Sequence, residues 1–171
     1  SEVQFSNSAI IRYSQLFEMN STITVFCNRG TSGIDGSTST ALGAAYATQK
    51  PTTLITGDLS FFYDSNALWN NYIPTDVRIV IINNSGGGIF KIIPGPKKST
   101  ALKYFETPHC LTAEHLCIMF GFEYSIAHNL KSLKEEVVGF YDKSEKPKLL
   151  EVFTPSDQND LVLKEYINNL K

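Results

Sequence analysis

The chain has 171 residues, of which 42% are hydrophobic, and this size and composition fit one domain over residues 1–171 with a sizeable core. Its formal net charge is −2 and it has no basic stripe, so a nucleic-acid partner is not expected. No apolar run approaches transmembrane length and no secretory leader is visible, so we expect neither membrane insertion nor secretion.

The three cysteines are an odd and sparse set, which argues against a disulfide framework and favours a reducing, cytoplasmic location. Two of them lie in a stretch that could bind zinc, because it holds His109, Cys110, His115 and Cys117. His115 and Cys117 are two positions apart in an expected helix, so they point to different sides. We therefore interpret these residues as core cysteines and surface histidines.

Apolar periodicity, caps and chain breakers predict an opening helix over residues 7–20, capped by Ser6 or Asn7, and then alternating strands and helices. The strands are expected at residues 23–27, 52–56, 77–82, 123–127 and 148–153. The helices are expected at residues 37–48, 61–72, 112–120, 132–141 and 157–170. This alternation predicts an α/β fold, with a doubly wound, mostly parallel sheet and helices on both faces.

Burial and loop character can also be predicted for three segments. Residues 23–27 form an apolar run and are expected to be a buried strand, and 77–82 is expected to be buried on both faces. The helix at 132–141 is expected to turn Val137 and Tyr141 toward the core. Residues 97–108 are polar without clear periodicity, and their length indicates a functional loop or lid.

Two expected strands end in polar, glycine-rich turns, Ile55-Thr-Gly-Asp58 and Ile82-Asn-Asn84-Ser-Gly-Gly-Gly-Ile-Phe90. Parallel strands of a doubly wound sheet bind ligands at their carboxyl ends. The turns offer a carboxylate, a carboxamide and a carbonyl, which are hard oxygen ligands for Mg²⁺, and N–H groups around Ser60 and Gly87 for a phosphate. Either turn alone is often only a loop or a helix cap, but the pair predicts a diphosphate site.

The motifs of other nucleotide-binding folds and of α/β-hydrolases are missing from the sequence. It contains no Gly-x-Gly-x-x-Gly after the first expected strand and no Walker-type Gly-Lys-Ser/Thr. It also lacks a Gly-x-Ser-x-Gly elbow, so an α/β-hydrolase is not expected. A third turn, at residues 28–36, is expected at the same sheet edge as the other two.

The paired turns resemble the Gly-Asp-Gly … Asn-Asn signature of thiamine-diphosphate enzymes, with Leu59 in place of the third glycine. Among thiamine-diphosphate enzymes, the chain is similar to the carboxyl-terminal domain of the 2-succinyl-5-enolpyruvyl-6-hydroxy-3-cyclohexene-1-carboxylate synthase family of menaquinone biosynthesis. In this family, leucine is normal at the position of Leu59. The segments that carry this resemblance are residues 7–12, 28–36, 57–60, 64–68 and 83–90.

The resemblance implies a thiamine-diphosphate-binding fold, with thiamine diphosphate and Mg²⁺ (or Mn²⁺) as cofactors. It implies metal binding by Asp58, Asn84 and the carbonyl of Gly86. The cofactor-binding residues that it implies are Ile34, Gly57, Asp58, Leu59, Ser60, Asn84, Gly86, Gly87, Ile89 and Phe90. The family joins decarboxylated 2-oxoglutarate to isochorismate, and Ser8, Arg12 and Arg29 would meet the substrate carboxylates. Arg12 has the alternative of an ordinary surface salt bridge.

Enzymes of this family use a glutamate on a pyrimidine-binding domain of a partner subunit. No such domain is expected within these 171 residues, so we expect no catalytic residue in this chain. The chain is then a carboxyl-terminal fragment of a larger homo-oligomeric transferase, inactive by itself.

Two other functions remain open. Another thiamine-diphosphate decarboxylase or carboligase would differ in the pocket, and Arg29 together with Ser8 and Arg12 argues against it. A non-catalytic phosphate-binding domain would not need an intact Asp58 and Asn84.

Overall fold

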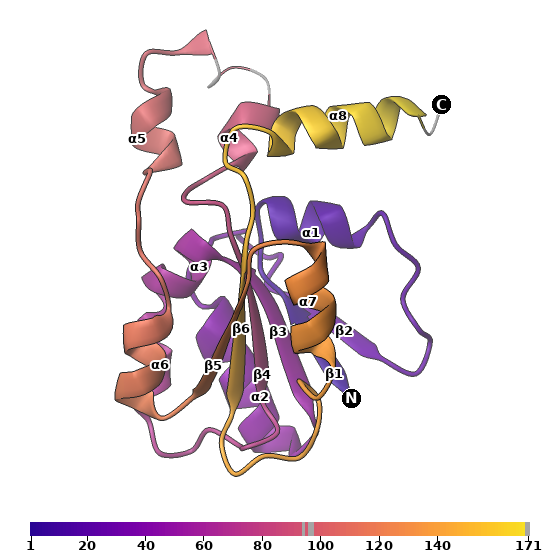
Figure 1. Ribbon diagram of the computed structural model, residues 1–171, viewed down its shortest axis with the longest axis vertical. Coiled ribbons are helices and arrows are strands. Elements are labelled where there is room, and N and C mark those ends of the chain that lie inside the picture. Colours follow the sequence, from indigo (N-terminus) through magenta and orange to yellow (C-terminus); the bar gives the residue numbers. More distant parts are fainter. Residues whose placement is uncertain (94, 96–97, 170–171) are drawn as a thin grey trace.

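The computed structural model describes residues 1–93, 95 and 98–169. It contains one six-stranded sheet with the strand order β2-β1-β3-β4-β6-β5 (Figure 1). The strands are β1 (Glu2–Phe5), β2 (Thr24–Cys27), β3 (Thr52–Gly57), β4 (Arg78–Asn83), β5 (Glu123–Ala127) and β6 (Lys148–Phe153). All neighbouring strands described here pair in parallel. The expected α/β fold with a mostly parallel sheet is therefore confirmed.

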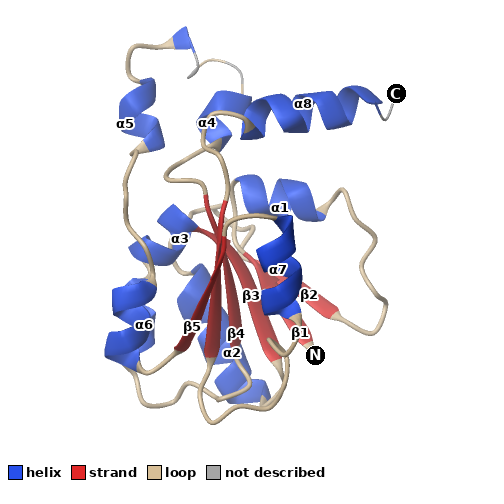
Figure 2. Cartoon of the chain, viewed as in Figure 1, coloured by secondary structure: helices blue, strands red, loops and turns tan. Residues whose placement is uncertain are grey.

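Helices cover both faces of this sheet (Figure 2). They are α1 (Ala9–Ser14), α2 (Ser37–Thr48), α3 (Asp58–Tyr63), the 3₁₀ helix η1 (Ser65–Trp69), α4 (Ile89–Ile92), α5 (Leu102–Glu106), α6 (Glu114–Phe120), α7 (Leu130–Val137) and α8 (Asn159–Asn169). Side chains alternate along β4, so Ile79 and Ile81 join the core with α2, α3, η1 and α6. Val80 and Ile82 pack on the other face with Leu133 of α7.

The first two strands differ from the prediction. β1 was not predicted, because Glu-Val-Gln-Phe alternates over only four positions. It lies between β2 and β3, where Glu2 is buried and accepts a hydrogen bond from Lys50 Nζ at 3.0 Å. The prediction of a buried strand at 23–27 is wrong about burial. β2 is an edge strand, in which Val25 and Phe26 are 41% and 47% exposed.

Two helices in the first half are shorter than predicted. The helix expected at 7–20 comprises only α1, which ends at Ser14. It begins after Ser8, which has a φ of 70° and makes no side-chain cap. Asn7 does not cap this helix and bonds to a neighbouring loop instead. The helix expected at 61–72 is divided at Asp64, whose carboxylate accepts a hydrogen bond from Ser39 N–H at 2.7 Å.

Two helices in the second half begin at other residues than predicted. α7 starts at Leu130, because Asn129 and Ser132 form a capping box there. It ends at Val137, so Val137 and Tyr141 are 43% and 60% exposed and do not face the core as expected. α6 begins after Ala113, without a side-chain cap from the threonine before it.

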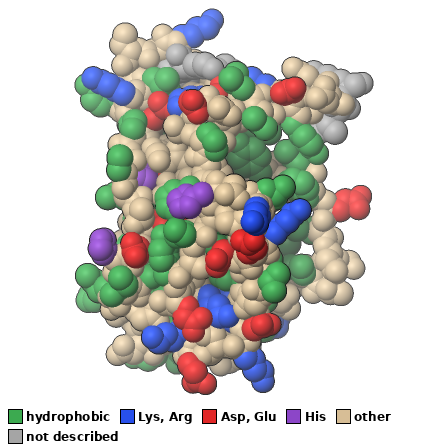
Figure 3. Space-filling view, in the orientation of Figure 1, with side chains coloured by type: hydrophobic (Ala, Val, Ile, Leu, Met, Phe, Trp, Pro, Cys, Tyr) green, Lys and Arg blue, Asp and Glu red, His purple; other side chains and the backbone are tan. Residues whose placement is uncertain are grey.

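Mixed charge characterises the face drawn in Figure 3, where basic and acidic side chains are interspersed. The same face is hollowed beneath α8, and hydrophobic side chains gather in the hollow. Among the helices of the described ranges, none is long and apolar enough to cross a membrane.

The strand register determines which turns can meet. Ile55 O accepts a hydrogen bond from Ser6 N–H at 3.0 Å, and Gly57 pairs with Ile82 across β3 and β4. The carboxyl ends of β1, β3 and β4 are therefore neighbours, and each is followed by a polar turn. This edge of the sheet is where a doubly wound fold binds its ligand.

Candidate functional site

A cavity of about 390 Å³ opens at the carboxyl ends of β1, β3 and β4. All ten residues that the resemblance assigns to the cofactor line it, namely Ile34, Gly57, Asp58, Leu59, Ser60, Asn84, Gly86, Gly87, Ile89 and Phe90. Ser60 Oγ donates a hydrogen bond to Ile34 O, which joins the turn after β2 to helix α3. Residues from three separate turns are thereby brought to one cavity.

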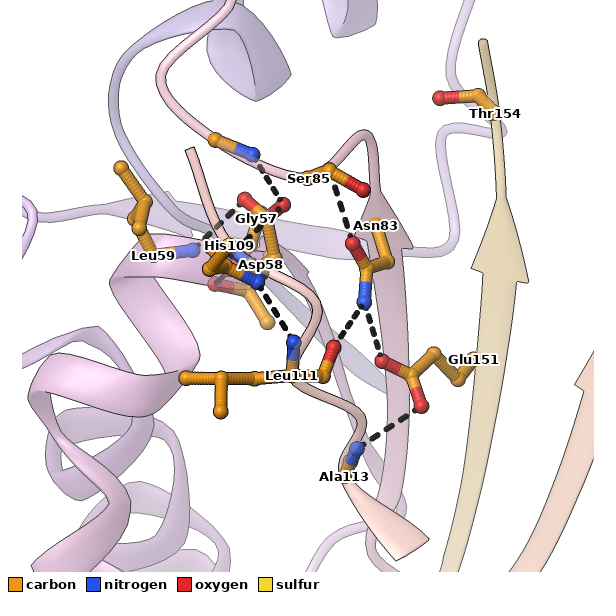
Figure 4. Close-up of polar contacts among 12 residues, drawn as sticks. Gly57, Asp58, Leu59, Asn83, Ser85, His109, Leu111, Ala113, Glu151 and Thr154 are labelled. Atoms are coloured by element: carbon orange, nitrogen blue, oxygen red, sulfur yellow. Dashed lines mark hydrogen bonds and ion pairs between the residues drawn. The ribbon is translucent and has the colours of Figure 1, made fainter. Parts of the chain in front are cut away.

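Asp58 is the first residue of α3 and follows β3 directly, so its carboxylate projects from the end of the strand (Figure 4). Its side chain is buried, and it accepts hydrogen bonds from Leu59 N–H at 2.7 Å and Gly86 N–H at 2.9 Å. Burial raises the pKa of Asp58, although these two bonds and nearby His109 lower it in part. A bound cation would favour the ionised carboxylate at this buried position.

His109 contacts the same carboxylate oxygen as the glycine turn. Its Nε2 lies 3.2 Å from Asp58 Oδ2, and its Nδ1 accepts a hydrogen bond from Leu111 N–H at 3.0 Å. In the neutral ring this leaves the proton on Nε2. Nε2 is buried, and within the described residues it makes no hydrogen bond. It is therefore a buried polar atom with an unsatisfied hydrogen-bonding group.

The possible zinc ligands of the sequence are dispersed. Cys117 lies in the hydrophobic core, where burial, with the charges of Glu151 and Glu114, raises the pKa of its thiol to about 12. Zinc needs the thiolate form of cysteine, which this environment disfavours. Cys110 is exposed, whereas His109 faces Asp58. In the described part of the chain, no group of three or more His, Cys, Asp or Glu residues could hold a metal ion.

The turn after β4 is held by Asn83, which the sequence analysis did not assign to the site. Asn83 Oδ1 accepts a hydrogen bond from Ser85 N–H at 3.0 Å. Its Nδ2 donates to Leu111 O at 3.0 Å and to Glu151 Oε1 at 2.7 Å (Figure 4). In the sequence, the adjacent Asn-Asn pair could have indicated a role for Asn83 in the site. For Glu151 the sequence offered only an acidic residue within an apolar strand.

Glycine is required at position 86 of this turn, and Gly88 leaves room for a neighbouring side chain. Gly86 has a φ of 145°, and a Cβ there would lie 2.6 Å from Glu106 O. A Cβ on Gly88 would lie 2.6 Å from Asn84 Nδ2, so the carboxamide rests against bare backbone. The N–H of Gly87, expected to face a phosphate, instead donates to Glu106 O at 2.7 Å.

The segment expected to be a functional loop or lid lies beside this turn. Its described residues include α5, and Tyr104, Phe105 and Thr107 line the cavity. The Phe105 ring lies 5.3 Å from that of Phe90, and Lys91 pairs with Glu106 at 2.8 Å. Residue 97 of the expected loop lies outside the described residues, as do residues 94 and 96 just before it.

The three residues proposed to meet substrate take different positions. Ser8 lines the cavity, whereas Arg12 and Arg29 are exposed and do not. Arg29 Nη1 donates to Asn7 Oδ1 at 2.9 Å, and Asn7 does line the cavity. Asn7 Nδ2 also donates to the carbonyls of Asn28 and Gly33, both at 2.7 Å. Asn7 therefore connects Arg29 to the cavity edge.

Several cavity residues were not assigned to the site from sequence, because local sequence gives little indication of what they contact. They are Asn7, Tyr13, Tyr63, Tyr104, Phe105 and Asn159. A second hollow of about 290 Å³, between α1 and α8, shares Tyr13, Ile82 and Asn159 with the cavity. The adjacent aromatic residues Tyr104 and Phe105 in a polar stretch were the one sequence signal available.

The donor set fits a small hard cation with a diphosphate. Asp58 supplies one buried carboxylate, and Asn84 and Gly86 of the neighbouring turn line the same cavity. Mg²⁺ is commonly held by one or two carboxylates, with waters and phosphate oxygens completing its shell. Around this polar end the cavity is mainly apolar, with Ile34, Ile89 and other hydrophobic residues, as a ring-bearing ligand requires.

Comparison with known proteins agrees with this donor set. Residues 7–152 match the family described as thiamine pyrophosphate enzyme, C-terminal TPP binding domain. Three similar proteins carry the name 2-succinyl-5-enolpyruvyl-6-hydroxy-3-cyclohexene-1-carboxylate synthase. Those of Christiangramia forsetii and Flavobacterium johnsoniae are both 56% identical, over 100% and 99% of this chain. That of Bacteroides thetaiotaomicron is 43% identical over 99% of it. The chain spans only 30% or 31% of the length of these relatives.

Proposed function

The chain belongs to the family of C-terminal TPP-binding domains of thiamine pyrophosphate enzymes, and from this premise we propose that it is the cofactor domain of a 2-succinyl-5-enolpyruvyl-6-hydroxy-3-cyclohexene-1-carboxylate synthase. The complete enzyme decarboxylates 2-oxoglutarate and adds the resulting unit to isochorismate in menaquinone biosynthesis. The observation that carries the proposal is the hydrogen bond between Gly86 N–H and Asp58, which joins the two signature turns in one cavity.

The cofactor end of the site follows from the donors already described. Asp58, the Asn84 side chain and the Gly86 carbonyl are the groups that would hold Mg²⁺, or Mn²⁺, together with the diphosphate. Leu59 and Ser60 line the cavity and would border the diphosphate, while Ile34, Ile89 and Phe90 line it and would exclude water from the apolar rings. When bound, thiamine diphosphate would supply a thiazolium ring, which takes up the electron pair left by loss of carbon dioxide.

We propose that the substrate end of the site prefers anionic substrates. Both substrates carry carboxylates, and a guanidinium fork matches a carboxylate in two hydrogen bonds. Ser8 borders the cavity, and Asn7 holds Arg29 at its edge, which supports their role in orienting substrate. Arg12 lies on α1, about one helical turn after Ser8, the residue that precedes this helix. Its side chain is exposed, so it can face an incoming carboxylate.

The complete site is proposed to need a second domain. In the described part of the chain, Asp58 is the only carboxylate that lines the cavity, and it is assigned to the metal. The activating glutamate is therefore placed on the pyrimidine-binding domain of a partner subunit in a homo-oligomer. The free cysteines support a cytoplasmic location, because such a location keeps thiols reduced.

The test is made on the complete enzyme. Calorimetry is expected to show thiamine diphosphate binding that depends on Mg²⁺, and carbon dioxide release from 2-oxoglutarate should rise when isochorismate is added. Mg²⁺-dependent binding with turnover of pyruvate but not 2-oxoglutarate would indicate another decarboxylase or carboligase. Phosphate binding without affinity for thiamine diphosphate would indicate a non-catalytic phosphate-binding domain.

Replacing Arg29 with alanine in the complete enzyme is expected to lower kcat/KM for an anionic substrate by about 10- to 100-fold, the value of a hydrogen bond to a charged group. Cofactor affinity should stay near that of the wild type, because Arg29 does not line the cavity. Arg29→Lys is the matched control and should restore only part of the loss, since an ammonium lacks the paired donors. Collapse of cofactor binding in Arg29→Ala would contradict the substrate assignment.

A further inference from the structure

Glu151, in the middle of β6, is a completely buried acid that the cofactor site described above does not use. Its Oε1 accepts a hydrogen bond from Asn83 Nδ2 at 2.7 Å. Its Oε2 accepts from Ala113 N–H at 2.9 Å and from Tyr124 OH at 2.6 Å. Within the described ranges no Lys, Arg or His side chain forms an ion pair with it. A buried carboxylate without a cation is costly, so its hydrogen bonds have to compensate.

The three partners of Glu151 are all donors as they are arranged, and this pattern selects a carboxylate. The Ala113 amide can only donate, and Asn83 presents its Nδ2 because its Oδ1 accepts from Ser85 N–H. Burial, and then the hydrogen bond to Glu151, raises the pKa of Tyr124, so its hydroxyl remains a donor. A glutamine at position 151 would place its NH₂ against one of these donors and leave a buried polar group unsatisfied.

Asn83 transmits this constraint to the metal-binding turn. If the Asn83 amide flipped to suit a glutamine, its NH₂ would face Ser85 N–H and its oxygen would face Leu111 O. Both hydrogen bonds would be lost (Figure 4). Ser85 has a φ of 61°, which is unfavourable for a residue with a side chain and has to be held by such contacts. The residues on either side of Ser85 are Asn84 and Gly86, the two ligands that this turn offers.

We propose that Glu151 is a positioning residue for metal binding, whose buried carboxylate fixes the Asn83 amide and through it the conformation of residues 83–86. The inference rests on the proposed function, because it assigns Mg²⁺ to the Asn84 side chain and the Gly86 carbonyl. Glu151 does not touch the metal or the cofactor; it acts through Asn83. Partners of metal ligands typically change metal affinity by about 10- to 100-fold when they are removed.

The experiment is a calorimetric titration of the complete enzyme with Mg²⁺ at saturating thiamine diphosphate. Glu151→Gln is expected to weaken the apparent Mg²⁺ affinity by about 10- to 100-fold. Tyr124→Phe is the matched control, because it removes a hydrogen bond from the same carboxylate without touching the Asn83 contact. Both variants should lower the melting temperature, but Tyr124→Phe should keep the wild-type affinity for Mg²⁺.

Each outcome separates the inference from the proposed function. Equal Mg²⁺ affinity in wild type and Glu151→Gln would overturn the inference alone, and so would an equal loss in Glu151→Gln and Tyr124→Phe. A wild type that binds neither Mg²⁺ nor thiamine diphosphate would overturn the proposed function itself. If Glu151→Gln does not fold, Asn83→Ala replaces it, because the carboxylate then keeps Ala113 and Tyr124. Wild-type Mg²⁺ affinity in Asn83→Ala would overturn the inference as well.

Discussion

Replacing Asp58 with alanine in the complete enzyme is expected to weaken thiamine diphosphate binding in Mg²⁺ by more than the roughly 10- to 100-fold loss typical when only a ligand's partner is removed. The reason is that, among the described residues, Asp58 is the only carboxylate that lines the cavity where we propose that the metal binds, and its Oδ2 also accepts a hydrogen bond from Gly86 N–H at 2.9 Å. Its removal therefore takes away a ligand and a contact that joins the two turns. Calorimetric titration with cofactor at fixed Mg²⁺ measures the effect.

Asp64 offers a matched control for this substitution. It is a second buried acid on the same stretch, but its carboxylate accepts hydrogen bonds from Ser39 N–H and Ser39 Oγ at the start of α2. Asp64→Ala is expected to cost about 1 kcal/mol of stability, as loss of a helix cap does, and to leave Mg²⁺ affinity unchanged. Unchanged cofactor affinity in Asp58→Ala would contradict the metal assignment.

The wild-type Mg²⁺ affinity should also depend on pH. Metal binding requires the ionised carboxylate, and burial raises the pKa of Asp58 above the usual range of aspartate. Affinity should therefore decline as the pH falls through this raised pKa, at a higher pH than an exposed aspartate would require.

The 171-residue chain by itself is expected to fold but to turn over its substrates at least about 10²-fold more slowly than the complete enzyme, since acid–base assistance is worth about 10²- to 10⁴-fold. Folding is expected because both faces of the sheet bury a core in this chain alone. Among the described residues, no carboxylate besides Asp58 lines the cavity to assist the far end of the cofactor. An open half-site also leaves the reacting atoms in water, where fixed dipoles act weakly.

The assay compares the isolated chain with the complete enzyme in 2-oxoglutarate, isochorismate, thiamine diphosphate and Mg²⁺. Circular dichroism of the isolated chain controls for folding, so that inactivity is not mistaken for loss of structure. Equal turnover by both proteins would show that no second domain is needed, and the proposed division of the active site would be wrong.

Local sequence was sufficient to predict most of the sheet. Apolar, β-branched residues between chain breakers located β3, β4, β5 and β6 to within one residue, because such residues favour a pleated, buried surface. β1 was missed because four alternating residues with Glu2 give too little signal, and its burial depends on neighbours on both sides. The helix at 61–72 was overextended because the bond between Asp64 and Ser39 joins residues 25 positions apart.

The ligand-bearing turns were predicted in the same way, from residue types next to strand ends. Asp58 and Asn84 each follow an apolar strand, and parallel strands must end at one edge, so their proximity follows from the alternation of elements. The supporting residues could not be predicted like this. His109, Leu111 and Ala113 lie in a connection without regular structure, and local sequence does not say what such a segment touches.

The amino-acid sequence by itself therefore determined the α/β alternation, the two signature turns and the chemical types of the proposed ligands, because these depend on neighbouring residues. Only the tertiary structure decided what holds the turns in place. Glu151 reaches Asn83 across 68 positions because β6 lies between β4 and β5, a strand order that no local pattern encodes. The Asn83 amide and the buried carboxylate are paired by that strand order, since hydrogen bonds across a parallel sheet depend on which strands are neighbours.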